Sequence, residues 1–249
     1  MNRFLCLVGF SLIAHSLAFA EGTVVWPLPP PVPGVNTAIT PLPALGWFQH
    51  FQFNMETAKK MPKVDLVFDG DSITDFWMNR GKLIWNQHYA KLNAYDFGIS
   101  GDRTENLLWR LQNGQVDTLH PKLIALMIGT NNLAANTPEE IAEGVKADVN
   151  EYRKLCPDSV ILLQAIFPRG EKSDDPARGK IKAINQIISQ LDDGNKIIYM
   201  DFGDKFLQPD GTLSHDIMPD FLHPSDKGYQ IWADAIQPEI DKILSNPSP

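Results

Sequence analysis

Ser72 stands in a segment whose residue types suit nucleophilic catalysis. It follows the apolar run 64–68 and Gly70, and it precedes residues that can turn into a helix. At such a position, backbone N–H groups and the helix dipole favour negative charge as it develops. A serine hydroxyl is a poor nucleophile unless a base removes its proton. The alternative interpretation is that Ser72 only caps the helix.

The base must come from a histidine elsewhere in the chain. His50 and His88 lie in helical stretches, and His120 precedes a strand, on the wrong edge of the expected sheet. His215 and His223 lie in the last loop, and only His223 has a carboxylate three residues before it, Asp220. If this segment curls as one helical turn, Asp220 and His223 share a face, so that Asp220 orients the imidazole. Alone, this spacing is more typical of a solvated turn.

Negative charge on a reacting oxygen also needs hydrogen-bond donors. The N–H of Ser72 is one, and Gly101 ends a glycine-rich loop where bare backbone can approach a substrate closely. Asn131 offers a side-chain NH₂ just beyond another strand, although an asparagine there often only supports its own turn. Together these residues predict an oxyanion hole beside Ser72.

An alternation of strands and helices must bring these residues together. Five apolar runs have strand length, and between them lie stretches with helical spacing. The expected strands are 64–68, 94–97, 123–128, 160–166 and 197–202; the expected helices are 47–61, 73–92 with a break at Gly81, 103–113, 138–155, 176–192 and 226–245. This pattern predicts one three-layer α/β/α domain with a five-stranded parallel sheet, whose ligand site lies at the carboxyl ends of the strands.

Four sequence blocks resemble the SGNH (GDSL-type) hydrolase family. They are Phe68-Asp-Gly-Asp-Ser-Ile-Thr74, Phe97-Gly-Ile-Ser-Gly-Asp-Arg-Thr104, Ile128-Gly-Thr-Asn-Asn132 and Asp220-Phe-Leu-His223. The chain is most similar to the brain-type platelet-activating factor acetylhydrolase catalytic subunits and their bacterial relatives. Two further segments support this likeness, Leu107–Leu111 and Pro168–Lys172.

The resemblance implies a role for each matching residue. Ser72 would be the nucleophile and His223 the general base, oriented by Asp220. The oxyanion hole would consist of the Ser72 N–H, the Gly101 N–H and the Asn131 side chain. The resemblance also implies a flavodoxin-like sheet and no metal or organic cofactor.

Two features depart from the family pattern. Asp69 stands where an apolar residue or small spacer usually precedes Gly-Asp-Ser, and its carboxylate could lie close to Asp71. The N-terminus also differs from that of the cytosolic acetylhydrolase subunits, so their lipid substrate and partners are not transferred to this chain.

Two other functions compete with the hydrolase interpretation. Asp69 and Asp71 resemble the Asp-x-Asp start of haloacid-dehalogenase-type phosphatases, which would make the site magnesium-dependent. That family requires Thr where Ile73 stands, and the interpretation leaves Gly101, Asn131 and the Asp220–His223 pair unused. A non-catalytic carbohydrate-binding protein on the same fold is the other rival, and it would predict a broken triad.

The N-terminus predicts export. A charged start, an apolar run and Ala18-Phe19-Ala20 indicate a signal peptide over 1–20, cleaved after Ala20; an uncleaved anchor is the alternative. Seven prolines in 21–45 predict an extended arm that either spaces the domain from the terminus or lies on its surface, and the hydrolase domain spans 46–249. After cleavage only Cys156 remains, which excludes an internal disulfide and predicts a buried apolar residue.

Charge and composition limit the partners. With 22 basic and 30 acidic residues and no basic cluster, the chain is not expected to bind nucleic acid. Loop 168–178 is almost entirely polar, which suits a short acyl group on a hydrophilic alcohol better than a long-chain lipid. We therefore expect a secreted or periplasmic serine esterase that removes short acyl groups, with acetyl foremost, from a small-molecule or polysaccharide ester. A lipid-directed acetylhydrolase or lysophospholipase is the alternative, and a homodimer is left open.

Overall fold

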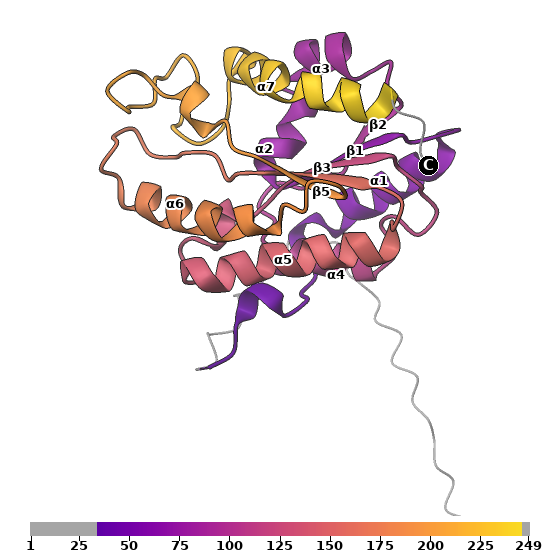
Figure 1. Cartoon of the computed structure of the whole chain (residues 1–249). Coiled ribbons are helices and arrows are strands. Elements are labelled where there is room, and N and C mark those ends of the chain that lie inside the picture. Colours follow the sequence, from indigo (N-terminus) through magenta and orange to yellow (C-terminus); the bar gives the residue numbers. More distant parts are fainter. Residues whose placement is uncertain (1–33, 246–249) are drawn as a thin grey trace, which may run out of the picture.

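The computed structural model describes residues 34–245, and it contains one parallel sheet of five strands (Figure 1). The strands are β1 (Leu66–Gly70), β2 (Ala94–Asp96), β3 (Leu123–Met127), β4 (Val160–Gln164) and β5 (Ile197–Met200). Their order across the sheet is β2-β1-β3-β4-β5, and every neighbouring pair is parallel. The predicted flavodoxin-like fold is thus confirmed.

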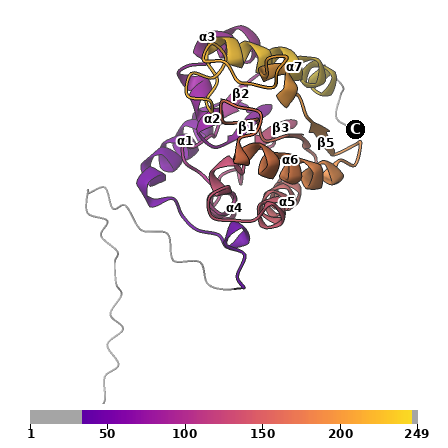
Figure 2. The ribbon, with the colours of Figure 1, turned by 90° about the vertical axis from the view of Figure 1, so that its left-hand side faces the viewer.

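Helices cover both faces of the sheet (Figures 1 and 2). They are α1 (Phe48–Lys60), α2 (Ser72–Asp75), α3 (Lys82–His88), α4 (Thr104–Gln112), α5 (Pro138–Leu155), α6 (Pro176–Ile188) and α7 (Asp226–Ser245). One apolar core joins β-strand side chains to α1, α4, α5 and α6, and a second, rich in aromatic rings, joins them to α2, α3 and α7. Cys156 is buried, as expected.

The first strand ends two residues later than its apolar run suggests. The run 64–68 predicts that Asp69 and Gly70 belong to the following loop, whereas both lie in β1. Asp69 is a buried strand residue because a guanidinium and other donors surround its carboxylate. The strand therefore delivers Asp71 and Ser72, not Asp69, to the edge of the sheet.

The predicted helix 73–92 is divided into short pieces. The four-residue α2 continues as a 3₁₀ turn, Phe76–Met78, and α3 begins only after Gly81. Gly81 packs directly against aromatic rings, since a Cβ there would lie 2.6 Å from the Trp77 ring and 2.9 Å from the Tyr229 ring. The break at Gly81 follows from this close packing.

The described part of the N-terminal arm lies on the domain surface (Figure 2). The Thr104 hydroxyl donates to the Ala38 carbonyl at 2.8 Å, and the Leu42 N–H donates to the Glu105 carbonyl at 3.0 Å. Ala38 is fully buried by α4 and α5. Residues 34–45 are therefore fastened to the domain and do not act there as a free spacer.

The predicted signal peptide and its cleavage site lie outside the described residues. Between residues 34 and 245, no helix combines the length and apolar character needed to cross a bilayer.

Candidate active site

Ser72 is the first residue of α2, at the carboxyl end of β1. Asp71 caps this helix, since its Oδ1 accepts the Ile73 N–H at 2.9 Å. The interpretation of Ser72 as the helix cap is therefore wrong. The preceding turn depends on Gly70, where a Cβ would lie 2.2 Å from the Met127 carbonyl oxygen of β3. Ser72 thus stands where β1 meets β3, the topological switch point at which ligands bind in such sheets.

A chain of two hydrogen bonds joins Ser72 to the last loop. The Ser72 Oγ lies 2.9 Å from His223 Nε2, although the two residues are 151 positions apart. The His223 Nδ1 lies 2.7 Å from Asp220 Oδ2. This is the geometry in which a base takes the proton of a hydroxyl while a carboxylate orients the base.

Asp220 and His223 meet through a side-chain turn, which differs from the expected helical turn. Asp220 Oδ1 accepts the N–H groups of His223 and Leu222 at 2.7 and 3.2 Å, and Phe221 between them has a positive φ of 55°. Partial burial opposes ionisation of Asp220, but these hydrogen bonds and that from the imidazole outweigh it and lower its pKa. The Asp220 carboxylate is therefore charged at neutral pH.

The imidazole of His223 also has an aromatic neighbour. The Phe76 ring lies 5.0 Å from it, and the Arg80 guanidinium lies 5.0 Å from the centre of the Phe76 ring. Arg80 Nη1 is 3.8 Å from Asp220 Oδ2, a solvent-exposed ion pair. Phe76 therefore packs against the imidazole, and the positive charge of Arg80 partly offsets the negative charge of Asp220.

His215 lies in the same loop and has a different environment. Its ring packs at a tilt against Phe221, with the ring centres 4.3 Å apart, and its Nδ1 is 2.8 Å from the Pro219 carbonyl oxygen. It thus supports the turn that presents His223, and it has no described hydrogen bond to Ser72.

The predicted oxyanion donors lie along one loop and one neighbouring strand end. Gly101 has a φ of +87°, which a side chain would strain. The Asn131 side chain donates from Nδ2 to the carbonyl of Asp102 at 2.8 Å, so it lies against the segment that carries Gly101. The Ser100 N–H and hydroxyl both donate to Asp75 of α2. The loop is therefore tied both to Asn131 and to the helix that begins at Ser72.

Asp69 and Asp71 have separate partners. Asp69 is fully buried, and its Oδ1 accepts hydrogen bonds from Arg110 at 2.9 Å and from the Gly70 N–H at 2.8 Å. It is enclosed by protein donors, which is incompatible with the nucleophilic role that the phosphatase interpretation requires. Burial raises the pKa of Asp71 to about 7, although its hydrogen bond from Ile73 acts in the opposite direction.

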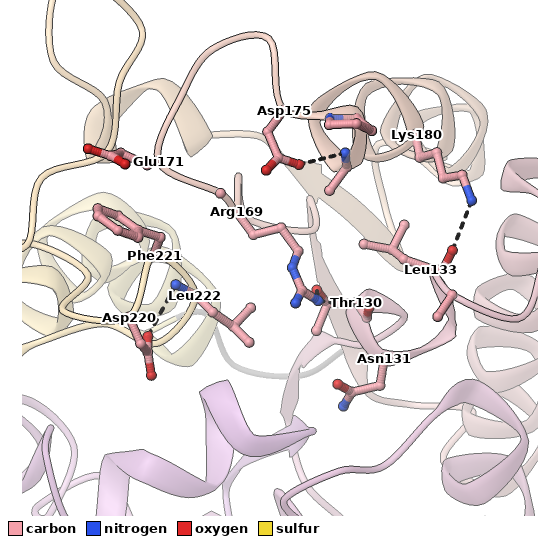
Figure 3. A pocket seen from close by; sticks show the side chains of 14 residues that line it. Thr130, Asn131, Leu133, Arg169, Glu171, Asp175, Lys180, Asp220, Phe221 and Leu222 are labelled. Atoms are coloured by element: carbon pink, nitrogen blue, oxygen red, sulfur yellow. Dashed lines mark hydrogen bonds between the residues drawn. The ribbon is translucent and has the colours of Figure 1, made fainter.

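An open pocket of about 840 Å³ adjoins the site (Figure 3). Asn131 and Asp220 both line it, together with charged residues from the loop after β4 and from α6. Arg169 points toward Thr130, with Nη1 3.3 Å from the Thr130 hydroxyl, and Lys180 donates to the Leu133 carbonyl at 2.9 Å. The pocket wall therefore combines charged side chains from loop 168–178 and α6 with apolar ones such as Leu133, Phe221 and Leu222.

Trp77 and Trp85 follow the nucleophile in the sequence, and both belong to the aromatic core. The tryptophan exposed next to the site is a different one. Trp47 is 48% exposed, and its Nε1 would lie 3.6 Å from a Cβ at Gly101. Sequence reasoning missed it because Trp47 lies one turn before Phe51 and looks like part of the same apolar helix face.

Within residues 34–245, no three His, Cys, Asp or Glu side chains are grouped so that they could hold a metal ion.

Comparison with known proteins gives matches to one enzyme family. Residues 68–231 match the model of the GDSL-like lipase/acylhydrolase family. The chain is 34% identical over 220 residues to rat platelet-activating factor acetylhydrolase IB subunit alpha1, covering 85% of this chain and 92% of the relative. A Drosophila melanogaster subunit beta homologue is also 34% identical, over 84% of this chain and 93% of that protein.

Solved structures share the fold at lower identity. A GDSL-like lipase from Bacteroides thetaiotaomicron has a TM-score of 0.63 and 21% identity, covering 78% of this chain and 98% of that chain. Axe2, an acetylxylan esterase from Geobacillus stearothermophilus, has a TM-score of 0.55 and 21% identity, with 75% and 98% covered.

Proposed function

Because this chain belongs to the GDSL-like lipase/acylhydrolase family and is a carboxylic ester hydrolase, we propose that it is a serine esterase specific for short acyl groups, acetyl foremost, on hydrophilic alcohols such as sugars. The observation that carries this proposal is the hydrogen-bonded series from Ser72 through His223 to Asp220, with distances of 2.9 and 2.7 Å.

In the first half of the reaction, Ser72 attacks the ester. His223 Nε2 takes the hydroxyl proton as Oγ bonds to the carbonyl carbon, and Asp220 stabilises the imidazolium that forms. The N–H groups of Ser72 and Gly101 and the Asn131 side chain donate to the resulting oxyanion. When this intermediate collapses, the C–O bond to the alcohol breaks, and the alcohol oxygen takes the proton from His223. An acyl-serine remains.

In the second half, water replaces the alcohol. His223 takes a proton from the water as its oxygen attacks the acyl carbon, and the same donors hold the second oxyanion. Collapse of that intermediate breaks the bond to Oγ, which takes the proton back from His223. The carboxylic acid leaves, and the free serine is restored.

The surroundings of the site support a polar alcohol. Arg169, Glu171 and Lys180 face the pocket beside Asn131 and Asp220, where a hydrophilic group can exchange water for charged hydrogen-bond partners. Trp47, exposed beside Gly101, offers the aromatic face on which the apolar side of a sugar ring can lie. Two similar proteins are named a platelet-activating factor acetylhydrolase and an acetylxylan esterase, and both names describe the hydrolysis of acetyl esters.

A lipid-directed acetylhydrolase is the second candidate, favoured by the identity of 34% to subunits that carry that name. The proposal also includes export to the periplasm or the medium, for which the sequence of residues 1–20 is the support.

The test is hydrolysis of p-nitrophenyl esters from acetate to octanoate, with EDTA present, by the wild type, Ser72→Ala and Ser189→Ala. Ser189 follows α6 and serves as a matched serine control. We expect acetate to be the best substrate, Ser72→Ala to lose at least about 10³-fold in kcat, and Ser189→Ala to match the wild type. Activity that survives in Ser72→Ala, or that EDTA abolishes, would contradict the mechanism.

Acetylated xylo-oligosaccharide and an acetylated ether phospholipid then separate the two candidates. A higher kcat/KM for the oligosaccharide supports the carbohydrate esterase, and the reverse order supports the lipid acetylhydrolase.

A further inference from the structure

A buried arginine connects the strand before Ser72 to the loop that carries Gly101. The Arg110 side chain on α4 is only 4% exposed. Its Nη2 lies 2.9 Å from Asp69 Oδ1 on β1, and its Nε lies 2.7 Å from Asp102 Oδ2. Gln115 and Tyr152 complete the shell around Asp69. The mechanism above uses none of these side chains.

Asp102 has a second set of contacts on its main chain. Its carbonyl accepts the Asn131 Nδ2–H at 2.8 Å, and its N–H donates to the Ile99 carbonyl at 3.1 Å. Asp102 also follows Gly101 directly. Asp102 therefore binds the guanidinium with its side chain. Its backbone accepts a hydrogen bond from Asn131 and is joined directly to Gly101, so it contacts both proposed oxyanion donors.

We propose that Arg110 is a positioning residue, which fixes Asp102 and thereby holds the Gly101 N–H and the Asn131 side chain in the orientation that the oxyanion requires. This inference rests on the proposed function. Gly101 has a positive φ and lies in an exposed turn, with the Trp47 indole as the side chain nearest to the position of a Cβ. A planar guanidinium bonded to two buried carboxylates supplies a restraint from inside the domain, with two fixed directions that an ammonium group could not provide.

The arrangement also explains the acidic residue at position 69. Asp69 accepts two N–H groups of Arg110 on one side and the Gly70 N–H on the other. It therefore ties the guanidinium to β1, the strand that precedes Ser72. The strand before Ser72 and the loop that carries Gly101 are both bonded to Arg110, which keeps their relative position constant.

A purely structural role is the competing explanation, in which Arg110 only neutralises Asp69. The two roles differ in one measurable respect. A structural role lowers the amount of folded enzyme, whereas a positioning role lowers kcat through Asn131 and Gly101 in molecules that remain folded.

The experiment uses Asp102→Ala, which cuts the link to the loop and leaves the Arg110–Asp69 pair intact. Asp102→Asn is the conservative variant, since its amide oxygen can still accept from Arg110 Nε. Ser159→Ala is the matched control, because its buried hydroxyl donates to the Pro121 carbonyl at the opposite edge of the sheet. Each is assayed on p-nitrophenyl acetate at a temperature where circular dichroism shows it folded.

If Arg110 acts as proposed, Asp102→Ala lowers kcat by about 10- to 100-fold with KM within about twofold, and Asp102→Asn restores most of the loss. In an Asn131→Ala background, the same Asp102→Ala change lowers kcat by a smaller factor than it does alone, because one of the two donors that it misplaces is already absent. Ser159→Ala lowers the melting temperature without lowering kcat.

Three results would overturn the inference: fully multiplicative losses in the double variant, a rise in KM with kcat unchanged, or a full loss in Asp102→Asn as well. Should Asp102→Ala not fold at any assay temperature, Arg110→Lys decides in its place. Lysine can reach only one of the two carboxylates, and the same loss of kcat and the same non-additivity with Asn131→Ala are expected. Failure of the proposed function is distinct, because the wild type would then lack Ser72-dependent esterase activity.

Discussion

The solvent exposure of Asp220 leads to a quantitative prediction for Asp220→Asn. The asparagine oxygen can still accept the N–H groups of His223 and Leu222, which hold the turn. What the variant loses is the negative charge 2.7 Å from the imidazole Nδ1. It therefore removes the stabilisation of the imidazolium and leaves the position of the backbone unchanged.

The size of the expected loss in kcat follows from the solvent exposure of the Asp220 carboxylate. The Asp220 side chain is 46% exposed, so its charge is partly screened by water. Two unit charges at about 4 Å interact by about 1 kcal/mol in water and about 4 kcal/mol near a protein surface. Arg80 lies 3.8 Å from the same carboxylate and weakens its field further. An intermediate value of about 2 kcal/mol corresponds to roughly a 30-fold loss in kcat. That is far below the loss of about 10⁴ known for a buried triad aspartate.

The assay is the kcat and KM of p-nitrophenyl acetate hydrolysis for the wild type, Asp220→Asn and Asp216→Asn. Asp216 lies in the same loop with a side chain 76% exposed, and it pairs with Lys227 instead of His223. We expect kcat to fall by about 10- to 100-fold in Asp220→Asn with little change in KM, and Asp216→Asn to stay within about twofold of the wild type. A loss below threefold would refute the role of the charge. A loss above about 10³-fold would refute the argument from exposure.

Two further predictions concern stability and substrate choice. Burial raises the pKa of Asp71 from 3.8 to about 7, so the folded state holds this proton more tightly than the unfolded state. The contribution of Asp71 to the free energy of unfolding is therefore fully present below about pH 4 and is lost as the pH rises through 7. Asp71→Asn keeps the helix cap but cannot ionise, so urea unfolding at pH 4, 5.5 and 7 should show the free energy of unfolding of the variant rising relative to that of the wild type by up to about 4 kcal/mol; a difference that does not change with pH would contradict this. Trp47→Ala should lower kcat/KM for acetylated xylo-oligosaccharide by about tenfold and leave p-nitrophenyl acetate within twofold, because only the sugar can use the indole face. Phe53→Ala, 62% exposed on α1, is its control, and an equal loss on both substrates would argue against a sugar platform.

Several elements could be predicted from local sequence alone. The helices 138–155 and 226–245 begin and end where predicted. At the first, Thr137 and Glu140 cap each other's backbone and Pro138 occupies the first turn, so neighbouring residues specify the start. The strands are recognisable as apolar runs, although all five end earlier or later than the run itself. An apolar run reports burial, whereas a strand ends where its hydrogen-bonded partner ends.

The candidate site, too, could be predicted only in part from the sequence. The sequence alone singled out Ser72, Gly101, Asn131, Asp220 and His223, because the residues that follow parallel strands must meet at one edge of the sheet. Their catalytic roles remain predictions until the variants are assayed. The sequence did not indicate the side-chain turn at Asp220, whose Phe221 has a positive φ, nor the exposed Trp47 beside Gly101.

The tertiary structure alone decided the meaning of Asp69. From the sequence, this carboxylate could be read as the nucleophile of a phosphatase or as a source of charge beside Asp71. Its partner Arg110 stands 41 positions away on another element, and Tyr152 stands 83 positions away. Local pattern determines which residues form a strand or a helix, since each conformation repeats at short range. Which distant side chains meet is determined by strand order and helix packing, and only these convert Asp69 from a candidate nucleophile into a buried partner of Arg110.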